Sequence, residues 1–195
     1  MMQYKYRNFN SKRGKTMFYV SDIQSTAPQE YGNELQKLVY SALAQLQIPY
    51  QRVNTDEAIT MEDCVEINRK LQIEMVKTLF LCNRQKDDFY LFITKGDKLF
   101  RSKDFSAALG IPRVSFAPAD LMETMLGTKI GAATVFSCLL DTKNKVRIVF
   151  DADVLKSEWY GCSDGTTTGY MKVHTNDIVH KLLSFSNHKP FVIEV

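Results

Sequence analysis

Two apolar segments near the middle of the chain limit what this sequence can fold into. Residues 76–82 read VKTLFLC and residues 89–94 read FYLFIT, and the polar stretch NRQKDD joins them. Both segments have the length of β-strands, and a short polar connection between them predicts a hairpin. Apolar side chains fall on both faces of each strand, which predicts a central sheet covered on two sides.

One residue of the first segment does not fit a buried strand. Side chains alternate between faces, so Lys77 shares a face with Leu79 and Leu81, opposite Thr78 and Phe80. An ammonium group among leucines is costly to desolvate unless it has a partner or opens onto a cleft. The strand pattern alone favours a lysine whose stem packs along the sheet while its head reaches water.

The rest of the chain alternates between helical and extended patterns without a regular βαβ order. We therefore predict one α/β domain of the α+β type, with a central mixed β-sheet flanked by helices. Apolar spacing predicts helices over residues 29–47, 60–71, 103–110, 117–127 and 175–185. Apolar runs predict further strands over residues 48–54, 131–140, 146–151, 171–175 and 191–195.

Local signals mark the ends of several helices. Thr60 followed by Asp63 resembles a capping box, in which each side chain binds the other residue's backbone amide. Thr175 is the predicted N-cap of the last helix. Gly110 and Gly127 are the predicted stops of the two central helices.

The charge is unevenly distributed along the chain. The sequence carries 25 Lys and Arg against 22 Asp and Glu, but five of the cations lie in residues 1–16, which contain no acid. The remainder has 20 basic and 22 acidic side chains, so it is not a generally basic nucleic-acid binder. Any contact with nucleic acid must therefore be local.

The basic N-terminal segment predicts that the chain consists of an extension and a folded domain. Residues 1–28 are expected to form a basic, flexible N-terminal extension, and residues 29–195 the folded domain. Three explanations of the extension stay open: a disordered arm, a weak targeting sequence, or sequence that precedes a natural start at Met17.

Several classes of protein are disfavoured by what the sequence lacks. No segment has the roughly 18 to 20 continuous apolar residues that span a bilayer, and no secretory signal is evident, so we expect a cytoplasmic protein without membrane contact. The cysteines at 64, 82, 138 and 162 form no CxxC pair, which argues against a zinc site and a disulfide scaffold. Phosphate-binding loops and the GxSxG elbow are also missing.

Four segments of the chain occur in a familiar order. They read EAITMEDC, VKTLFLCNRQKDDFYLFITKGDK, LGIPRVSFAPADLMETMLG and VFDADVLKSEWYGC. Together they closely resemble the YbaK/prolyl-tRNA deacylase family, also called the prolyl-tRNA synthetase-associated domain. The likeness runs from about residue 30 to residue 195.

This resemblance implies a fold, an activity and a set of partners. Family members have a mixed sheet with flanking helices and hydrolyse mischarged aminoacyl-tRNA, chiefly alanyl- or cysteinyl-tRNA of the proline type. They act on the 3′ acceptor end without a metal, so we expect no cofactor. Prolyl-tRNA synthetase is a further candidate partner.

The resemblance also implies the site. Lys77 falls on the family's strand lysine, which lies in the substrate pocket and is needed for deacylation. A cation there would hold the 3′-terminal adenosine phosphate, or it would stabilise the negative charge that grows on the ester carbonyl. Its ammonium is expected to face segments 131–134 and 161–168 across a cleft. The implied substrate-binding residues are Thr60, Thr78, Gly131, Thr134, Gly161, Cys162, Ser163 and Thr168.

Two loops depart from the family pattern. The family's G-[SA]-V-S-P-x-G-L is GAATVFSC here, and Ser163, Asp164 and Thr167 replace its histidine, proline and asparagine. An editing deacylase with altered specificity is therefore one hypothesis. A catalytically weakened relative that binds aminoacyl-tRNA or a synthetase is the other. A third, with Cys162 as an acyl-accepting nucleophile, lacks an evident base.

Overall fold

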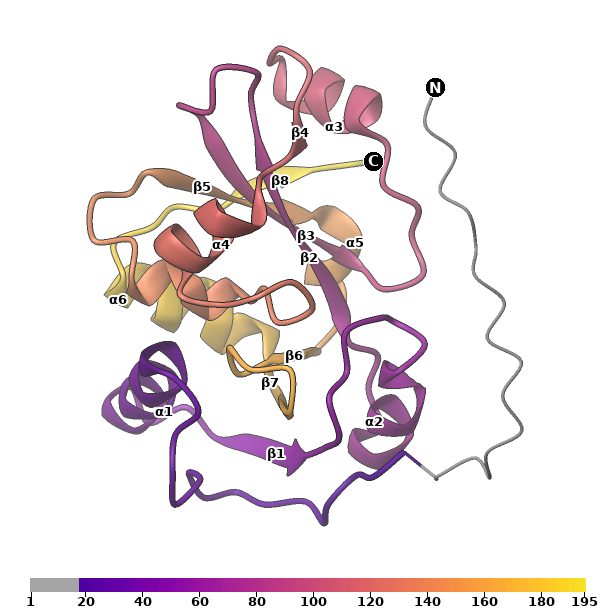
Figure 1. The fold of residues 1–195 in the computed structure, drawn as a ribbon, viewed down its shortest axis with the longest axis vertical. Helices are drawn as coiled ribbons and strands as arrows, with labels where there is room; N and C mark the ends of the chain where they lie inside the picture. Colours follow the sequence, from indigo (N-terminus) through magenta and orange to yellow (C-terminus); the bar gives the residue numbers. More distant parts are fainter. Residues whose placement is uncertain (1–17) are drawn as a thin grey trace.

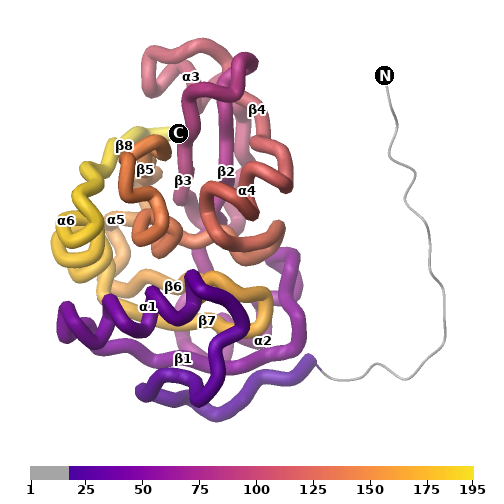
Figure 2. Tube along the Cα trace, turned by 60° about the vertical axis from the view of Figure 1, so that its left-hand side comes forward, coloured from indigo at the N-terminus to yellow at the C-terminus, as the bar shows by residue number. Residues whose placement is uncertain are grey.

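The structure is a computed structural model that describes residues 18–195. Two sheets share one core, and the smaller sheet lies below the larger one in both views (Figures 1 and 2). The five-stranded sheet has the order β4-β2-β3-β5-β8 and the three-stranded sheet the order β1-β7-β6. The strands are β1 Tyr50–Asn54, β2 Val76–Cys82, β3 Phe89–Lys95, β4 Ser115–Phe116, β5 Val146–Asp151, β6 Trp159–Ser163, β7 Gly169–His174 and β8 Phe191–Ile193.

The larger sheet is mixed, as predicted. β2 pairs antiparallel with β3 and β4, whereas β5 pairs parallel with β3 and β8. The smaller sheet is antiparallel throughout. The helical segments are α1 Glu34–Gln45, α2 Cys64–Leu71, α3 Ser102–Leu109, α4 Ala119–Leu126, η1 Val135–Leu139, α5 Ala152–Leu155, η2 Asp177–Leu182 and α6 Leu183–Phe185.

Both faces of the hairpin β2–β3 are buried, which confirms the first prediction. One face contributes Phe80, Leu91 and Ile93 to the main core, which also contains residues of α1, η1 and η2. The other face packs Leu81 and Phe92 with side chains of α3. A third apolar cluster lies between α2 and the smaller sheet. The hairpin is thus the layer that the rest of the fold covers.

The predicted helix signals are mostly confirmed. The backbone amide of Thr60 donates to Asp63 Oδ2 at 2.9 Å, and that of Asp63 donates to Thr60 Oγ1 at 3.4 Å, so the two residues form the capping box. Gly127 ends α4 with φ 64°, a conformation that glycine adopts without strain. The first helix starts at Glu34 because Asn33 is its N-cap and accepts the Gln36 amide at 2.7 Å.

Two sequence-based assignments were wrong. Residues 131–140 form no strand: a loop leads into η1, whose Val135 and Phe136 are fully buried. A continuous apolar run fits a buried helical turn as well as a strand, so the pattern did not distinguish them. The last helix is present, but the Thr175 hydroxyl does not cap it; it donates to the carbonyl of Ser157 at 2.7 Å.

Residues 18–28, which the sequence analysis placed in the extension, pack on the domain. The amide of Ser21 donates to the carbonyl of Asn54, and Gln24 and Arg52 exchange two backbone hydrogen bonds. Phe18 and Val20 pack against the cluster beneath α2. The basic residues 1–16 lie outside the described residues.

A buried carboxylate fixes the loop between β6 and β7. Asp164 is 1% exposed and accepts hydrogen bonds from Gln36 Nε2 at 2.8 Å and from Tyr40 OH at 2.9 Å, both on α1. It also accepts the amide and the hydroxyl of Thr166. Four donors compensate the desolvation of the charge, so the loop is held against α1.

We expect Asp164→Ala to destabilise the protein by about 3 kcal/mol, because Gln36 and Tyr40 lose a charged acceptor in a buried place. Urea unfolding measures the change. The exposed Asp97→Ala is the matched control and should change stability by less than about 0.5 kcal/mol. A loss below about 1 kcal/mol for Asp164→Ala would show that this carboxylate does not hold the loop.

Candidate active site

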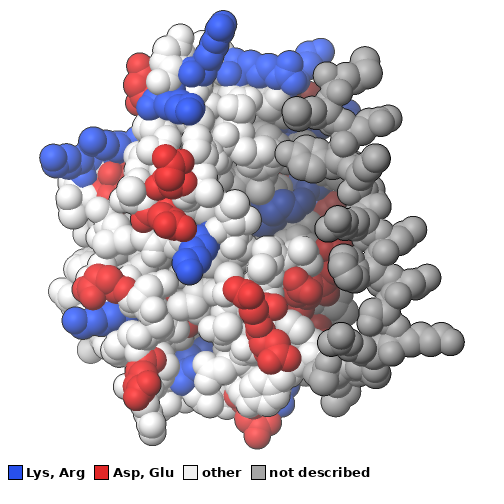
Figure 3. All heavy atoms as spheres, viewed as in Figure 1, with Lys and Arg blue, Asp and Glu red and all other residues white. Residues whose placement is uncertain are grey.

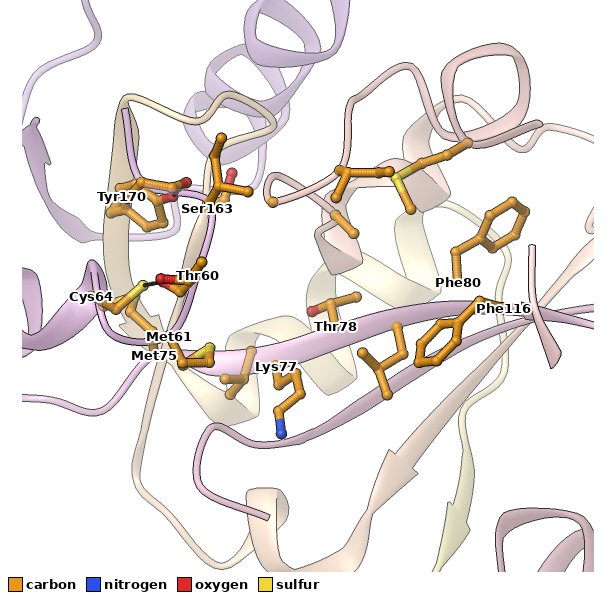
Figure 4. Close-up of a pocket in the computed structure, with 18 of the residues that line it drawn as sticks. Thr60, Met61, Cys64, Met75, Lys77, Thr78, Phe80, Phe116, Ser163 and Tyr170 are labelled. Carbon is orange, nitrogen blue, oxygen red and sulfur yellow. Dashed lines mark hydrogen bonds between the residues drawn. The ribbon is translucent and has the colours of Figure 1, made fainter. Parts of the chain in front are cut away.

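A pocket of about 440 Å³ opens along strand β2. Figure 4 shows its walls: Thr78 and Phe80 project from β2, Phe116 lies at one end, and Ser163 and Tyr170 of the smaller sheet lie at the other. Its volume lies in the range typical of sites for small ligands. The pocket therefore spans the space between the two sheets.

The pocket exists because one edge of β2 is only partly paired. β4 pairs with β2 at Leu81 and Cys82 alone. The Phe80 carbonyl points away from β3 and accepts the amide of Ala117 at 2.9 Å. In an antiparallel pair these orientations alternate, so the backbone N–H and C=O of Thr78 also face the open edge. A ligand in the pocket meets these two backbone groups.

The pocket walls are mainly apolar and rich in sulfur. Met61, Met75 and Met122 line it together with Cys64 and Phe116. Methionine side chains adapt to irregular ligands, and an apolar wall disfavours charged ones. The pocket suits a small uncharged group.

Most hydroxyl groups of the pocket are already hydrogen-bonded. Thr60 Oγ1 donates to Asp63 Oδ2 at 2.9 Å, and Tyr170 OH donates to the Ala58 carbonyl at 2.7 Å. Amide hydrogen bonds from Thr60 and Ile59 lower the pKa of the Asp63 carboxyl. These groups therefore shape the wall.

The hydroxyl of Ser163 is also already hydrogen-bonded. Its hydroxyl donates to the Thr166 carbonyl at 2.7 Å and accepts the amide of Gly165 at 3.0 Å. The thiol of Cys64 lies 3.5 Å from the Thr60 carbonyl, and burial raises its pKa to about 11. At neutral pH this thiol is protonated and is not a nucleophile.

Thr78 is the pocket hydroxyl for which the described part of the chain supplies no well-formed hydrogen bond. It lies near Tyr160, whose own hydroxyl is fully buried and without a partner among residues 18–195. Burial raises the pKa of Tyr160 well above its ordinary value. Thr78 thus offers a hydroxyl and a backbone edge to a ligand.

Lys77 does not point where the sequence analysis placed it. Its ammonium lies on the opposite side of β2 from Thr78 (Figure 4) and donates to the carbonyl of Lys98 at 2.6 Å. Strand alternation is the reason: the 131–134 and 161–168 segments lie on the Thr78 face. Lys77 is therefore one of the residues around the pocket, but its ammonium group points away from it.

Lys77 belongs instead to a polar group at the end of the sheet. It is paired in register with Thr94, whose hydroxyl donates to the buried Asp151 at 2.7 Å. Lys98 Nζ lies 2.8 Å from Asp151 and from Asp153. The Lys98 carbonyl, on the turn that these ion pairs hold, gives the Lys77 ammonium its partner on an otherwise apolar strand face.

The structure brings together some of the other predicted residues and separates the rest. Thr60, Thr78, Gly131 and Ser163 line the pocket. Thr168 lines a neighbouring cavity of about 420 Å³ on the far side of the 129–132 loop. Residues that lie behind the pocket wall are Thr134, Gly161 and Cys162, all buried.

One of these positions requires glycine, and a second is tightly packed. Gly131 has φ 91°, and a Cβ atom there would lie 2.8 Å from Ile59 Cα. A Cβ atom at Gly161 would lie 3.1 Å from the backbone oxygen of Glu74, near the bridge that joins β6 to the start of β2. The glycines therefore allow the pocket walls to approach each other.

Cys162 is not an acyl-accepting nucleophile. It is 2% exposed within the main core, and burial raises the pKa of its thiol strongly. The hydroxyl of Thr134 lies near it and has no hydrogen-bond partner in the described chain. A protonated, inaccessible thiol cannot attack an ester.

Sequence reasoning missed several residues that shape the pocket. Met75 and Tyr170 carry no motif, and Met61 and Phe116 were read only as parts of a longer likeness. Residues 18–195 contain no cluster of three or more His, Cys, Asp or Glu side chains placed to hold a metal ion. They also contain no helix long and apolar enough to cross a bilayer.

Solved structures share this fold. One, named as hypothetical protein APE2540, covers 80% of this chain and 98% of its own with a TM-score of 0.62 and 16% identity. Another, named "a putative trans-editing enzyme for prolyl tRNA synthetase", covers 85% of this chain and 99% of its own with a TM-score of 0.61 and 14% identity. Both proteins therefore share the fold of this chain.

The sequence gives the more specific result. The family model of the aminoacyl-tRNA editing domain matches residues 55–181, and the chain belongs to this family. The prolyl-tRNA editing protein ProX of Acetoanaerobium sticklandii is 27% identical over 122 residues, which cover 63% of this chain and 74% of that protein. Editing hydrolyses the ester between amino acid and tRNA, so the family places the chain among the deacylases.

We expect none of the four cysteines to react rapidly with DTNB at pH 8 in the folded protein. All four are buried, and burial raises the pKa of Cys64 to about 11 and of Cys138 to about 12. Unfolding in guanidinium chloride should expose four thiols. The Cys64→Ser variant should remove the fastest of the slow native phases, because Cys64 lines the pocket. Rapid labelling of Cys162 would contradict its burial.

Proposed function

We propose that this protein hydrolyses mischarged aminoacyl-tRNA in trans, with alanine or cysteine on tRNA of the proline type as its substrates. One observation carries the proposal: every residue that lines the pocket lies between Ala58 and Tyr170, inside the matched range 55–181. The relative from A. sticklandii is named for editing of prolyl-tRNA, which supports this tRNA as the substrate class.

The pocket walls support a small uncharged amino acid. Met61, Met75 and Cys64 leave little that would compensate the desolvation of a charged side chain. Alanine and cysteine satisfy this requirement, whereas aspartate and lysine do not. A pocket of this kind rejects an extra hydroxyl only weakly, by about a hundredfold, so seryl-tRNA is the closest competitor.

The open edge of β2 supports binding of the ester. A backbone N–H that already points into an apolar pocket stabilises an oxyanion without reorganisation. Thr78 provides such an N–H and a hydroxyl on the same wall. Water is the nucleophile in this proposal, helped by the terminal hydroxyl groups of the tRNA.

Lys77 remains the proposed catalytic residue, but in a side-chain rotamer that differs from the one in the structure. Its ammonium is held by one hydrogen bond to the backbone carbonyl of Lys98, an interaction worth about 2 kcal/mol. An anionic substrate attracts the same charge more strongly. Rotation around the edge of β2 then brings the ammonium to the developing oxyanion.

Domain limits and partners are part of the proposal. We place the catalytic domain at residues 18–195, because residues 18–28 pack along β1. The aminoacylated 3′ end occupies the pocket, and prolyl-tRNA synthetase is the protein partner that would supply mischarged tRNA.

We expect Lys77→Met to lower kcat/KM about a hundredfold on alanyl- or cysteinyl-tRNA, because the oxyanion loses a cation. Methionine keeps the apolar stem, so the free energy of unfolding should fall by no more than about 3 kcal/mol, the contribution of the lost hydrogen bond. Lys95→Met is the control, since Lys95 is exposed at the end of β3. The measurement is deacylation of alanyl-, cysteinyl-, seryl- and prolyl-tRNA.

Two outcomes would contradict parts of this proposal. Full activity of Lys77→Met would show that the lysine only ties β2 to the turn before α3, and Thr78 would then be the main stabilising group. A wild-type protein that binds charged tRNA but hydrolyses none of the four substrates would be a binding module, as the altered loops allow.

A further inference from the structure

A second concave surface adjoins the pocket and carries a local concentration of positive charge. We name it the basic hollow; it is open and has a volume of about 960 Å³. Five exposed cationic side chains line it, and no Asp or Glu does. They come from the β2–β3 turn, from the start of α3 and from the segment before β4: Arg84, Lys86, Arg101, Lys103 and Arg113.

The concentration is unusual for this chain. Outside residues 1–16 the sequence carries 20 cations against 22 acids, yet five of those cations line one hollow. Figure 3 shows Lys and Arg gathered along the top of the molecule, where α3 and the β2–β3 turn lie. The charge is therefore placed locally, as binding of nucleic acid by a slightly acidic domain requires.

These cations are not used by the fold. Within residues 18–195, none of the five forms an ion pair, and Arg113 makes one side-chain hydrogen bond, from Nε to Ser102 Oγ at 3.1 Å. The nearby acids of the turn have other partners: Asp87 binds Asn83, and Asp88 pairs with Arg147 at 3.1 Å. Asp104 on α3 is exposed and does not line the hollow.

Phe116 joins the hollow to the pocket. It lines both, and 62% of its surface is exposed. Its ring packs against Phe100 with a centroid distance of 5.5 Å, which fixes its orientation. An exposed aromatic ring between an apolar pocket and a cationic surface is an arrangement that stacks a nucleobase.

We propose that the basic hollow binds the phosphate backbone of the RNA whose 3′ end enters the pocket, with Phe116 stacked against a base close to that end. This inference rests on the proposed function for the identity of the RNA. Arginine and lysine contact phosphates without regard to sequence, so the hollow supplies affinity and register. The pocket then selects the amino acid.

Continuity with the pocket favours RNA over other anionic partners. An acidic peptide or an anionic membrane would use the charges of the hollow but neither Phe116 nor the pocket beyond it. A polynucleotide uses all three, because a phosphate chain and a terminal nucleoside are parts of one molecule.

The Kd of tRNA that carries no amino acid tests the proposal, because its measurement does not depend on hydrolysis. The triple variant Arg101→Gln/Lys103→Gln/Arg113→Gln should raise Kd about tenfold or more at 0.1 M salt. Each lost phosphate contact should make the slope of log Kobs against log[salt] shallower by about one. Phe116→Ala should raise Kd about tenfold while leaving the salt slope unchanged.

A charge-matched control separates the hollow from net charge. Lys143→Gln/Lys145→Gln/Lys189→Gln removes three exposed cations that do not line the hollow, and its Kd and slope should match the wild type. Circular dichroism and urea unfolding establish that all variants are folded.

The outcomes distinguish this proposal from the proposed function. Hydrolysis of charged tRNA with wild-type Kd and salt slope in the hollow variant would overturn the hollow and leave the deacylase intact. Loss of tRNA binding in the hollow variant alone supports the hollow even if no substrate is hydrolysed. Binding to phosphatidylserine vesicles without binding to tRNA would overturn the RNA assignment in favour of a membrane.

Discussion

The pairing of β2 determines where this protein can bind anything. Along all seven residues the strand is paired with β3, but only Leu81 and Cys82 are paired on the other edge. At its start, Met75 bridges to Gly161 of the smaller sheet. Between these two points no strand pairs with the edge of β2, and the pocket lies beside it. An open edge normally invites aggregation, so its enclosure by loops both protects it and provides backbone groups for a ligand.

The loops that close the pocket differ from the family pattern but are well fixed. Ser163 ties the 163–166 turn together through two hydrogen bonds, and Asp164 anchors it to α1 through Gln36 and Tyr40. The amide of Asp164 also donates to the Gly169 carbonyl, a bond that proline could not make. These hydrogen bonds show that the side chains at 163 and 164 hold the loop in one ordered conformation.

Much of the fold was predictable from the sequence because local and long-range signals agree. The hairpin, the helix ends at Gly110 and Gly127 and the capping box at Thr60 all depend on local patterns. The prediction of a strand at 131–140 was wrong because a continuous apolar run has no periodicity that distinguishes a strand from a buried helical turn. For the site, the resemblance named Thr60, Thr78, Gly131 and Ser163, which line the pocket. Met75 and Tyr170 reach the pocket only through the pairing of the sheets.

Lys77 and Thr78 show how one strand serves stability and binding at once. Adjacent residues of a strand face opposite ways, so the Thr78 side chain meets the pocket while Lys77 joins the polar group of Thr94, Lys98 and Asp151. In that group Lys98 is ion-paired with Asp151 and Asp153, and the Lys77 ammonium donates to the Lys98 carbonyl. At the other end of β2 the cations of the basic hollow have no such partners within the described residues. The chain as a whole is not strongly basic, so the number of its lysines and arginines does not locate a binding site for a polyanion. The cluster of cations without ion pairs in the basic hollow does.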